Sequence, residues 1–174
     1  MRLFTLFLLL APSVFSQIRP APASCGPPEI KFDVKPDKSP HAIAQPEPGK
    51  ALVYIFEEFE DTQGGFIIPT IRVGLNGAWV GATRGASFLS FSVAPGEHHL
   101  CANWQSSASQ ISSQYSLTSF TAESGKVYFF KIAPRVESYH DSGNAWRKDL
   151  APVDHDEANY LIGISSLSAS HPHK

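Results

Sequence analysis

The residues best suited to chemistry lie in the stretch VAPGEHHLCANW, Val93–Trp104. It places His98 and His99 three and two residues before Cys101. Imidazole and thiolate are common zinc ligands, and a Cys/His pair can also act as a nucleophile with its base. The stretch is therefore a metal site, a catalytic pair, or a turn followed by a strand that carries a cysteine.

The alternation of side chains along a strand favours the third interpretation. Neighbouring side chains point to opposite faces, so His98 and His99 cannot bind one ion together. His99 and Cys101 share a face, but a structural zinc site takes four ligands, usually in two close pairs, and no second pair exists. Cys101, His99 and Asn103 lie side by side and do not converge on a substrate. We assign no catalytic residue and no metal ligand.

Other acidic and histidine clusters offer one alternative. The segment Glu57–Asp61 lacks the spaced ligands and central glycine of a calcium loop. His140 and His155 each lie beside acidic residues, in segments that are far apart in the sequence. A metal-dependent protein or enzyme that uses His99, His140 or His155 is therefore the alternative hypothesis.

Bulk charge and motifs exclude several classes of function. The chain has 14 Lys and Arg against 16 Asp and Glu, a formal net charge of −2, and its basic residues are scattered. No basic surface for nucleic acid is therefore expected. The sequence contains no GxSxG, no HExxH and no glycine-rich phosphate loop, so we predict no cofactor.

Aromatic residues are the remaining candidates for binding. We expect most to pack in the core. The alternative is a groove for sugar or peptide, for which there are five candidate aromatics: Trp79, Trp104, Tyr128, Phe130 and Trp146. Trp79 follows a turn, and the segment from Pro134 to Asp149 is longer than an ordinary loop. We place the candidate ligand groove at Trp79, Arg84 and Trp146.

The N-terminus has the features of an export signal. Arg2 precedes an apolar run of 13 residues, which is too short to span a bilayer. Small residues predict a signal peptide over 1–16, cleaved after Ser16, with a second possible cut after Ala23 and a buried N-terminal helix as the alternative. We expect a periplasmic or secreted protein without a membrane span.

Export also decides how the two cysteines are interpreted. An even, sparse count in an oxidising compartment indicates a disulfide between Cys25 and Cys101. Lipidation of Cys25 is the alternative, but PAS precedes it where lipoproteins usually have leucine at −3. Eight of the 14 prolines lie between Pro20 and Pro48. Residues 17–48 therefore form an extended arm, with one candidate strand over 29–34.

The period changes to that of strands from residue 49. Asn76-Gly77 indicates a hairpin, and Pro95-Gly96 a type II turn. The segments 115–121 and 126–133 are expected to pair as the last hairpin. Asp154 and Glu157 have the spacing of a helix capping box. We predict an all-β, antiparallel β-sandwich of about seven strands over 49–165, with one short C-terminal helix and a flexible tail over 166–174.

Several of these segments resemble a bacterial family, domain of unknown function 2846. They are GKALVYIF, VGLNGAWVGA, FLSFSVAPGEHHLCANW, GKVYFFKI and VDHDEANYLI, which together span about Gly49–Ser165. The resemblance implies an exported β-rich protein and carries over no site residue. A similar order of turns and strands in PEGA-type and transthyretin-like modules implies binding rather than catalysis. We expect a non-catalytic envelope or extracellular module for an unknown protein or glycan partner.

Overall fold

The computed structural model describes residues 21–59, 68–107, 109–139 and 143–173, and for 109–110, 134, 136–139 and 143–146 only the backbone. The predicted signal peptide lies outside these residues. The described part contains ten strands and two helices: β1 Phe32–Asp37, β2 Ala51–Glu57, β3 Thr70–Leu75, β4 Ala78–Arg84, β5 Ser87–Val93, β6 Gly96–Trp104, α1 Ser109–Ser112, β7 Tyr115–Ala122, β8 Val127–Tyr139, β9 Gly143–Pro152, α2 His155–Ile164 and β10 Ser166–Pro172.

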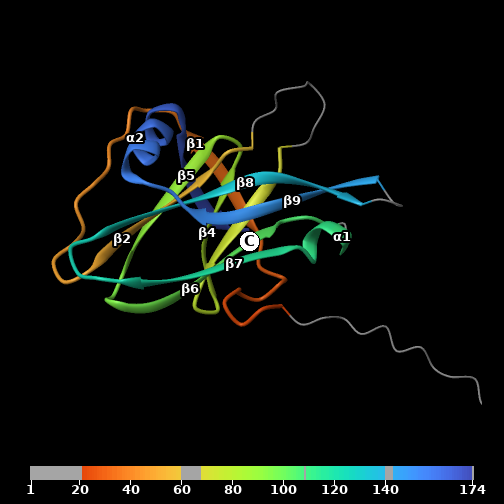
Figure 1. The fold of residues 1–174 in the computed structure, drawn as a ribbon, viewed down its shortest axis with the longest axis horizontal. Coiled ribbons are helices and arrows are strands. Elements are labelled where there is room, and N and C mark those ends of the chain that lie inside the picture. Colours follow the sequence, from red (N-terminus) through yellow and green to blue (C-terminus); the bar gives the residue numbers. More distant parts are fainter. Residues whose placement is uncertain (1–20, 60–67, 108, 140–142, 174) are drawn as a thin grey trace, which may run out of the picture.

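The strands form two sheets (Figure 1). One has six strands in the order β1-β10-β5-β2-β8-β9, and the other has four in the order β4-β3-β6-β7. The protein is thus mostly β, as predicted, but with ten strands rather than about seven. The pairing is also not purely antiparallel, because β8 runs parallel to β2 and β10 runs parallel to β5.

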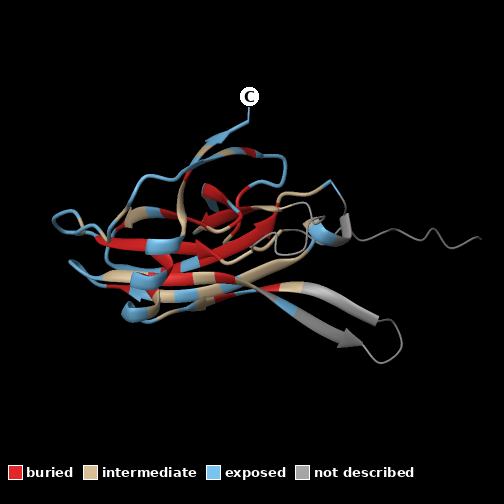
Figure 2. Ribbon diagram, turned by 90° about the horizontal axis from the view of Figure 1, so that it is seen from above, coloured by how far each residue is buried: buried red, intermediate tan, exposed pale blue. Residues whose placement is uncertain are grey.

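Two apolar clusters hold these layers together. The first lies between the two sheets and includes Val53 and Ile55 of β2 with Val73 and Leu100 of the smaller sheet. The second lies on the other face of the six-stranded sheet, beneath α2. Every residue of β2 is buried, since both its faces are covered, which explains its continuous apolar run. Figure 2 shows the buried residues concentrated in the middle strands.

The additional strands come from segments that were expected to be irregular. The tail 166–174 is not flexible as predicted, because Ser166–Pro172 is β10 and pairs with β1 of the arm. Phe32–Asp37 overlaps the strand expected over 29–34. The segment from Pro134 to Asp149 is not a loop either, since the β8–β9 ladder extends to Tyr139 and Gly143. These strands exist because distant partners satisfy their backbone groups.

The chain reverses where turns were predicted, but two of these connections join strands of different sheets, which do not pair. Asn76 and Gly77 have φ of 51° and 92° and join β3 to β4, which confirms the hairpin. The turn at Pro95-Gly96 instead joins β5 of one sheet to β6 of the other. The segments 115–121 and 126–133 likewise lie in different sheets and do not pair. A turn can bend a chain into either sheet, and burial of the apolar faces selects which one.

One half of the predicted capping box of α2 is present, while the Glu157 carboxylate pairs with Lys131. Asp154 is the N-cap, and its Oδ1 accepts a hydrogen bond of 2.8 Å from the Glu157 N–H. Within the described residues, none of the helices combines the length and apolar character needed to cross a membrane.

Candidate functional site

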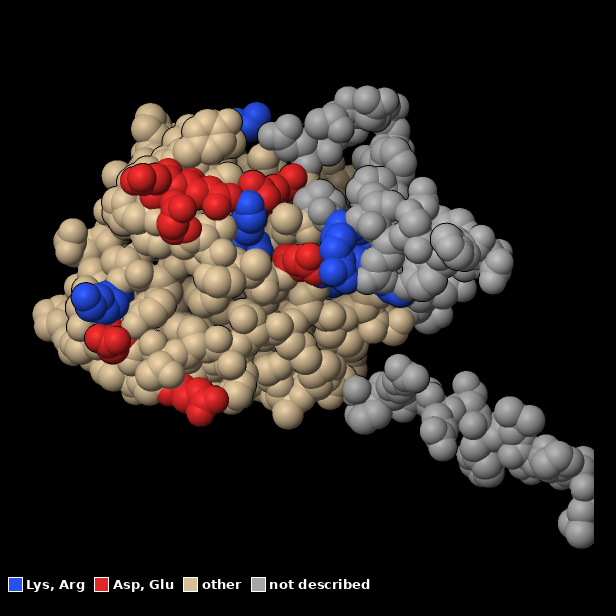
Figure 3. All heavy atoms as spheres, in the orientation of Figure 1, with Lys and Arg blue, Asp and Glu red and all other residues tan. Residues whose placement is uncertain are grey.

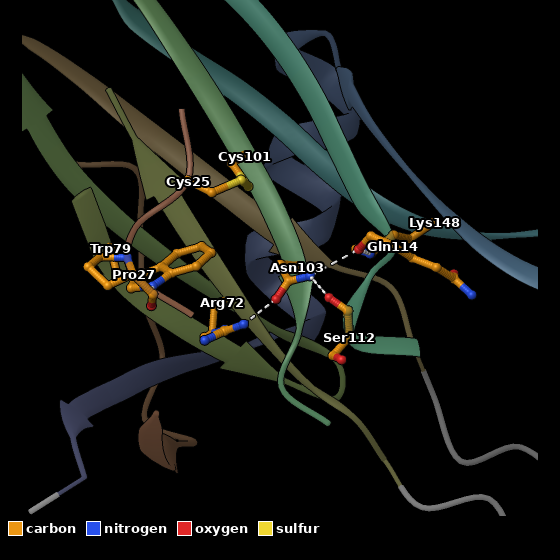
Figure 4. Close-up of a disulfide and its surroundings, with 9 residues drawn as sticks. All are labelled: Cys25, Pro27, Arg72, Trp79, Cys101, Asn103, Ser112, Gln114 and Lys148. Carbon is orange, nitrogen blue, oxygen red and sulfur yellow. Dashed lines mark hydrogen bonds between the residues drawn. A yellow bond between two sulfur atoms is a disulfide. The ribbon is translucent and has the colours of Figure 1, made fainter. Parts of the chain in front are cut away.

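The predicted disulfide is confirmed and attaches the arm to the smaller sheet. Cys25 and Cys101 are joined with their Cα atoms 5.3 Å apart, and both are buried. The arm lies so close to β3 that a Cβ on Gly74 would come 3.2 Å from the Cα of Cys25. The disulfide thus holds the arm against the outer face of the four-stranded sheet, the face opposite the first apolar cluster. Cys101 is a structural residue here (Figure 4).

Trp79 belongs to the packing of this arm rather than to an open groove. Its Nε1 donates a hydrogen bond of 2.7 Å to the Pro27 carbonyl, and a Cβ on Gly26 would come 2.4 Å from the ring. The Arg72 guanidinium lies 4.5 Å from the ring centroid, in cation–π geometry. The half-buried Trp79 ring therefore packs with the arm and Arg72, and its part in a ligand groove stays a prediction.

Arg72 is the polar centre of the closed face. Its Nη1 donates to the carbonyls of Pro28 and Ile30 at 2.8 and 2.7 Å, and its Nη2 donates to Asn103 Oδ1. Only 4% of Arg72 is exposed, and burial lowers its pKa from the usual value. Alternation along β3 placed Arg72 opposite the core, where solvent would be expected. The sequence contains no sign that the arm covers it.

Asn103 continues this network toward the other sheet. Its Nδ2 donates to the carbonyls of Ser112 and Gln114 at 2.8 and 3.1 Å. The Gln114 carbonyl also accepts 2.7 Å from Lys148 Nζ, which lies 5.0 Å from the Trp104 ring centroid. Burial lowers the pKa of Lys148 to about 7, and the charge of Arg147 adds to the effect. Figure 4 shows Arg72, Asn103 and Lys148 along this line.

Glu57 is a second buried titratable group. It lies at the end of β2, is 1% exposed, and its Oε1 accepts 3.0 Å from the Gly85 N–H. Burial raises the pKa of Glu57 to about 8, although hydrogen bonds from Thr83 and Gly85 and the charge of Arg84 act against this. Glu57 and Lys148 are held by separate sets of partners, so no acid–base pair is apparent from their contacts.

The histidines of the opening stretch have different environments. His98 Nε2 donates to the Ala94 carbonyl at 2.7 Å, and its Nδ1 accepts from Asn76 Nδ2 at 2.9 Å. His98 therefore fixes the Asn76 turn. His99 is exposed on the other face of β6, 3.7 Å from a Glu97 oxygen.

The metal alternative gains no support from the described residues. His155 begins α2 and contacts Asn159, and His140 lies outside the described part. No group of three or more His, Cys, Asp or Glu side chains suited to a metal ion occurs among the residues the structure places.

The other two residues of the predicted groove are Arg84 and Trp146. Arg84 is exposed at the end of β4, where its backbone N–H contacts Ser87 Oγ. The backbone of Trp146 lies in β9, but its side chain is outside the described part. A groove is present in another place.

An open depression of about 390 Å³ lies between β7 and β8, and we call it the β7–β8 groove. Its lining consists of Thr118, Ser119, Phe120, Val127, Tyr128, Phe129, Phe130, Pro152, Val153 and His155. Phe120, Tyr128 and Phe130 form one aromatic group, with ring centroids 5.1 and 5.2 Å from Phe120. Tyr128 and Phe130 were among the five aromatics considered for a groove, and Phe130, at 3% exposure, also belongs to the first apolar cluster.

The walls of this groove are strand edges. Consecutive residues of a strand point to opposite faces, so a surface lined by three consecutive residues of β7 and four of β8 exposes the main chain as well as side chains. β7 is the terminal strand of its sheet. β9 pairs with β8 only from Phe130 onward, because Pro152 and the cap of α2 end the ladder. Pro152 and Asp154 are the sequence signal that indicates this gap.

Comparisons with family profiles, with curated proteins and with solved structures find no match to this chain. The resemblance to domain of unknown function 2846 therefore stays a prediction.

Proposed function

We propose that the protein is an exported, non-catalytic β-sandwich module that binds a partner, and that the partner is a protein rather than a surface glycan. The β7–β8 groove carries the proposal. It joins an aromatic floor to two strand edges, and main-chain edges are groups that another polypeptide can pair with. Export is supported by the disulfide and by the apolar N-terminal run.

The absence of catalysis is part of this proposal. Among the described residues, burial raises the pKa of Glu57 to about 8 and lowers the pKa of Lys148 to about 7, and both groups are held by structural partners. Neither lines the groove. A catalytic acid or base must instead lie within hydrogen-bonding reach of its substrate.

The test compares capture by the exported full chain with capture by two variants. Thr118→Trp fills the groove, whereas Thr121→Trp places the same ring on the opposite face of β7. We expect one protein from the source envelope to be retained by the unmodified chain and by Thr121→Trp, and lost with Thr118→Trp. Turnover in a hydrolase or transferase panel that one substitution abolishes, or retention of a glycan alone, would overturn the proposal.

A further inference from the structure

We propose that the β7–β8 groove binds an extended, uncharged polypeptide segment of the partner, which adds as a short strand beside Val127 of β8. This inference rests on the proposed function and specifies the chemistry of the ligand.

The hydrogen bonds of β8 determine where its main chain points. The Lys126 carbonyl accepts 3.0 Å from the Leu52 N–H, so alternate residues starting at 126 face β2. Val127 and Phe129 therefore turn their N–H and C=O groups to the other side. The Phe129 carbonyl accepts 3.0 Å from the Val153 N–H. The N–H and C=O of Val127 lie one step further along, at the groove.

The position of an added strand follows from where β9 ends. β9 is antiparallel to β8 and reaches Pro152 opposite Phe130. The chain then turns into the Asp154 cap and α2. A segment that continues the line of β9 would lie beside Val127, with the edge of β7 on its other side. Strand addition of this kind obtains affinity from main-chain bonds and specificity from alternate side chains.

The lining specifies the side chains of the segment. Inward-pointing residues would meet the aromatic floor of Phe120, Tyr128 and Phe130, which favours apolar or β-branched side chains. No Lys, Arg, Asp or Glu lines the groove, so an unpaired charge buried there would be unfavourable. Figure 3 shows an uncharged area over β7, with acidic side chains gathered toward α2.

The acidic side chains beside the groove specify what flanks the segment. Asp154 and Asp156 are exposed at the start of α2, next to His155 of the lining. The nearby Glu157 is already paired with Lys131. We therefore expect a basic residue at the end of the segment that passes α2.

The probe is a capped octapeptide of three Thr-Val repeats followed by two lysines. Its matched control replaces the second and third threonines by proline, which keeps the charge but removes two N–H donors and the strand conformation. Binding to the isotope-labelled full chain is followed by NMR. We expect the probe to slow hydrogen exchange of the Val127 amide, and the proline control to bind at least tenfold more weakly.

Substitutions in and beside the groove locate the bound peptide. Thr118→Trp should weaken the probe at least tenfold, and Thr121→Trp should leave its affinity within twofold. If Thr118→Trp lowers the melting temperature, His155→Trp fills the same groove from the exposed start of α2. Asp156→Asn should weaken the probe two- to fivefold at low salt only, because its effect is electrostatic.

Three results overturn the inference. They are equal binding of probe and proline control, no change in exchange at Val127, and unchanged affinity in both groove-filling variants. If the partner is still captured, and adding either the probe or the proline control leaves capture unchanged, the strand-addition inference fails. The proposed binding function then still stands. If no partner is captured at all, the proposed function itself fails, whatever the probe does.

Discussion

The outer face of the four-stranded sheet is covered by the N-terminal arm, whereas its β7 edge is open. At its outer face the arm is held by a disulfide, by Trp79 and by Arg72. The aromatic and charged side chains of this face therefore pack against the arm. At its β7 edge the neighbouring strand β9 ends early, and Phe120 and Tyr128 line an open groove beside β8. A tryptophan near a turn therefore indicates a binding surface less well than the residue at which the pairing of two strands ends.

Removing the disulfide should have the largest effect on the closed side. The Cys25→Ala, Cys101→Ala double variant frees a link across 76 residues, which the loop-entropy model values at about 4 kcal/mol in the free energy of unfolding. Guanidinium denaturation of the oxidised wild type and the variant measures the loss. Peptide binding at the groove should stay within twofold. A loss below about 1 kcal/mol would mean that Arg72 and Trp79 hold the arm without the disulfide.

Arg72→Met should lower the free energy of unfolding by about 3 kcal/mol, because Asn103 Oδ1 and two arm carbonyls lose their donor. Hydrogen exchange should rise over the arm and not at the groove. Arg84→Met is the matched control at an exposed site on β4 and should change stability by less than about 0.5 kcal/mol. Equal effects of the two substitutions would refute a locking role for Arg72.

Lys148 gives the β9 side of the molecule a pH dependence. Its pKa is about 7 in the folded protein and 10.5 as the unperturbed value, so the unfolded state binds more protons between these limits. Stability should therefore rise with pH from 7 to 10.5, by up to about 1.4 kcal/mol per pH unit. Urea denaturation across this range should show the slope, and Lys148→Met should remove it. An unchanged slope in the variant would assign it to other groups.

Glu57 lies outside both regions and should give the opposite slope. Its pKa is about 8 when folded against 4.5 for the unperturbed group, so the folded state holds its proton longer. Stability should fall as the pH rises from 4.5 to 8, by up to about 1.4 kcal/mol per pH unit. Glu57→Gln keeps the shape without the charge and should flatten this part of the curve. If stability falls as steeply over this range in the variant, groups other than Glu57 cause the slope.

Trp79→Phe should have the smallest effect, about 1 kcal/mol, since it removes the hydrogen bond to Pro27 and keeps most of the ring. Thermal unfolding measures the change. Probe affinity at the groove should be unaffected, because Trp79 does not line it. A loss of probe or glycan binding in this variant would return the site to the closed side, near Trp79 and Arg84.

The sequence determined the features that depend on neighbouring residues. The positive φ of Asn76 and Gly77, the Asp154 cap and the buried run of β2 all follow from local backbone or hydrophobic preferences. The disulfide could be predicted from the sequence because the chain has only two cysteines. Of the ten residues that line the groove, only Tyr128 and Phe130 had been named as candidates, and the predicted groove was placed elsewhere.

Tertiary structure decided which segments meet. Strand pairing depends on distant partners, so β10 was expected to be a flexible tail, and β1 was only partly covered by the strand expected over 29–34. The connection at Pro95-Gly96 was likewise not known to cross between sheets. The same reason applies to the functional surface. Strand alternation alone predicts an exposed Arg72, but the arm covers it in the structure. The groove exists because Pro152 ends β9 opposite Phe130, three residues after β8 begins.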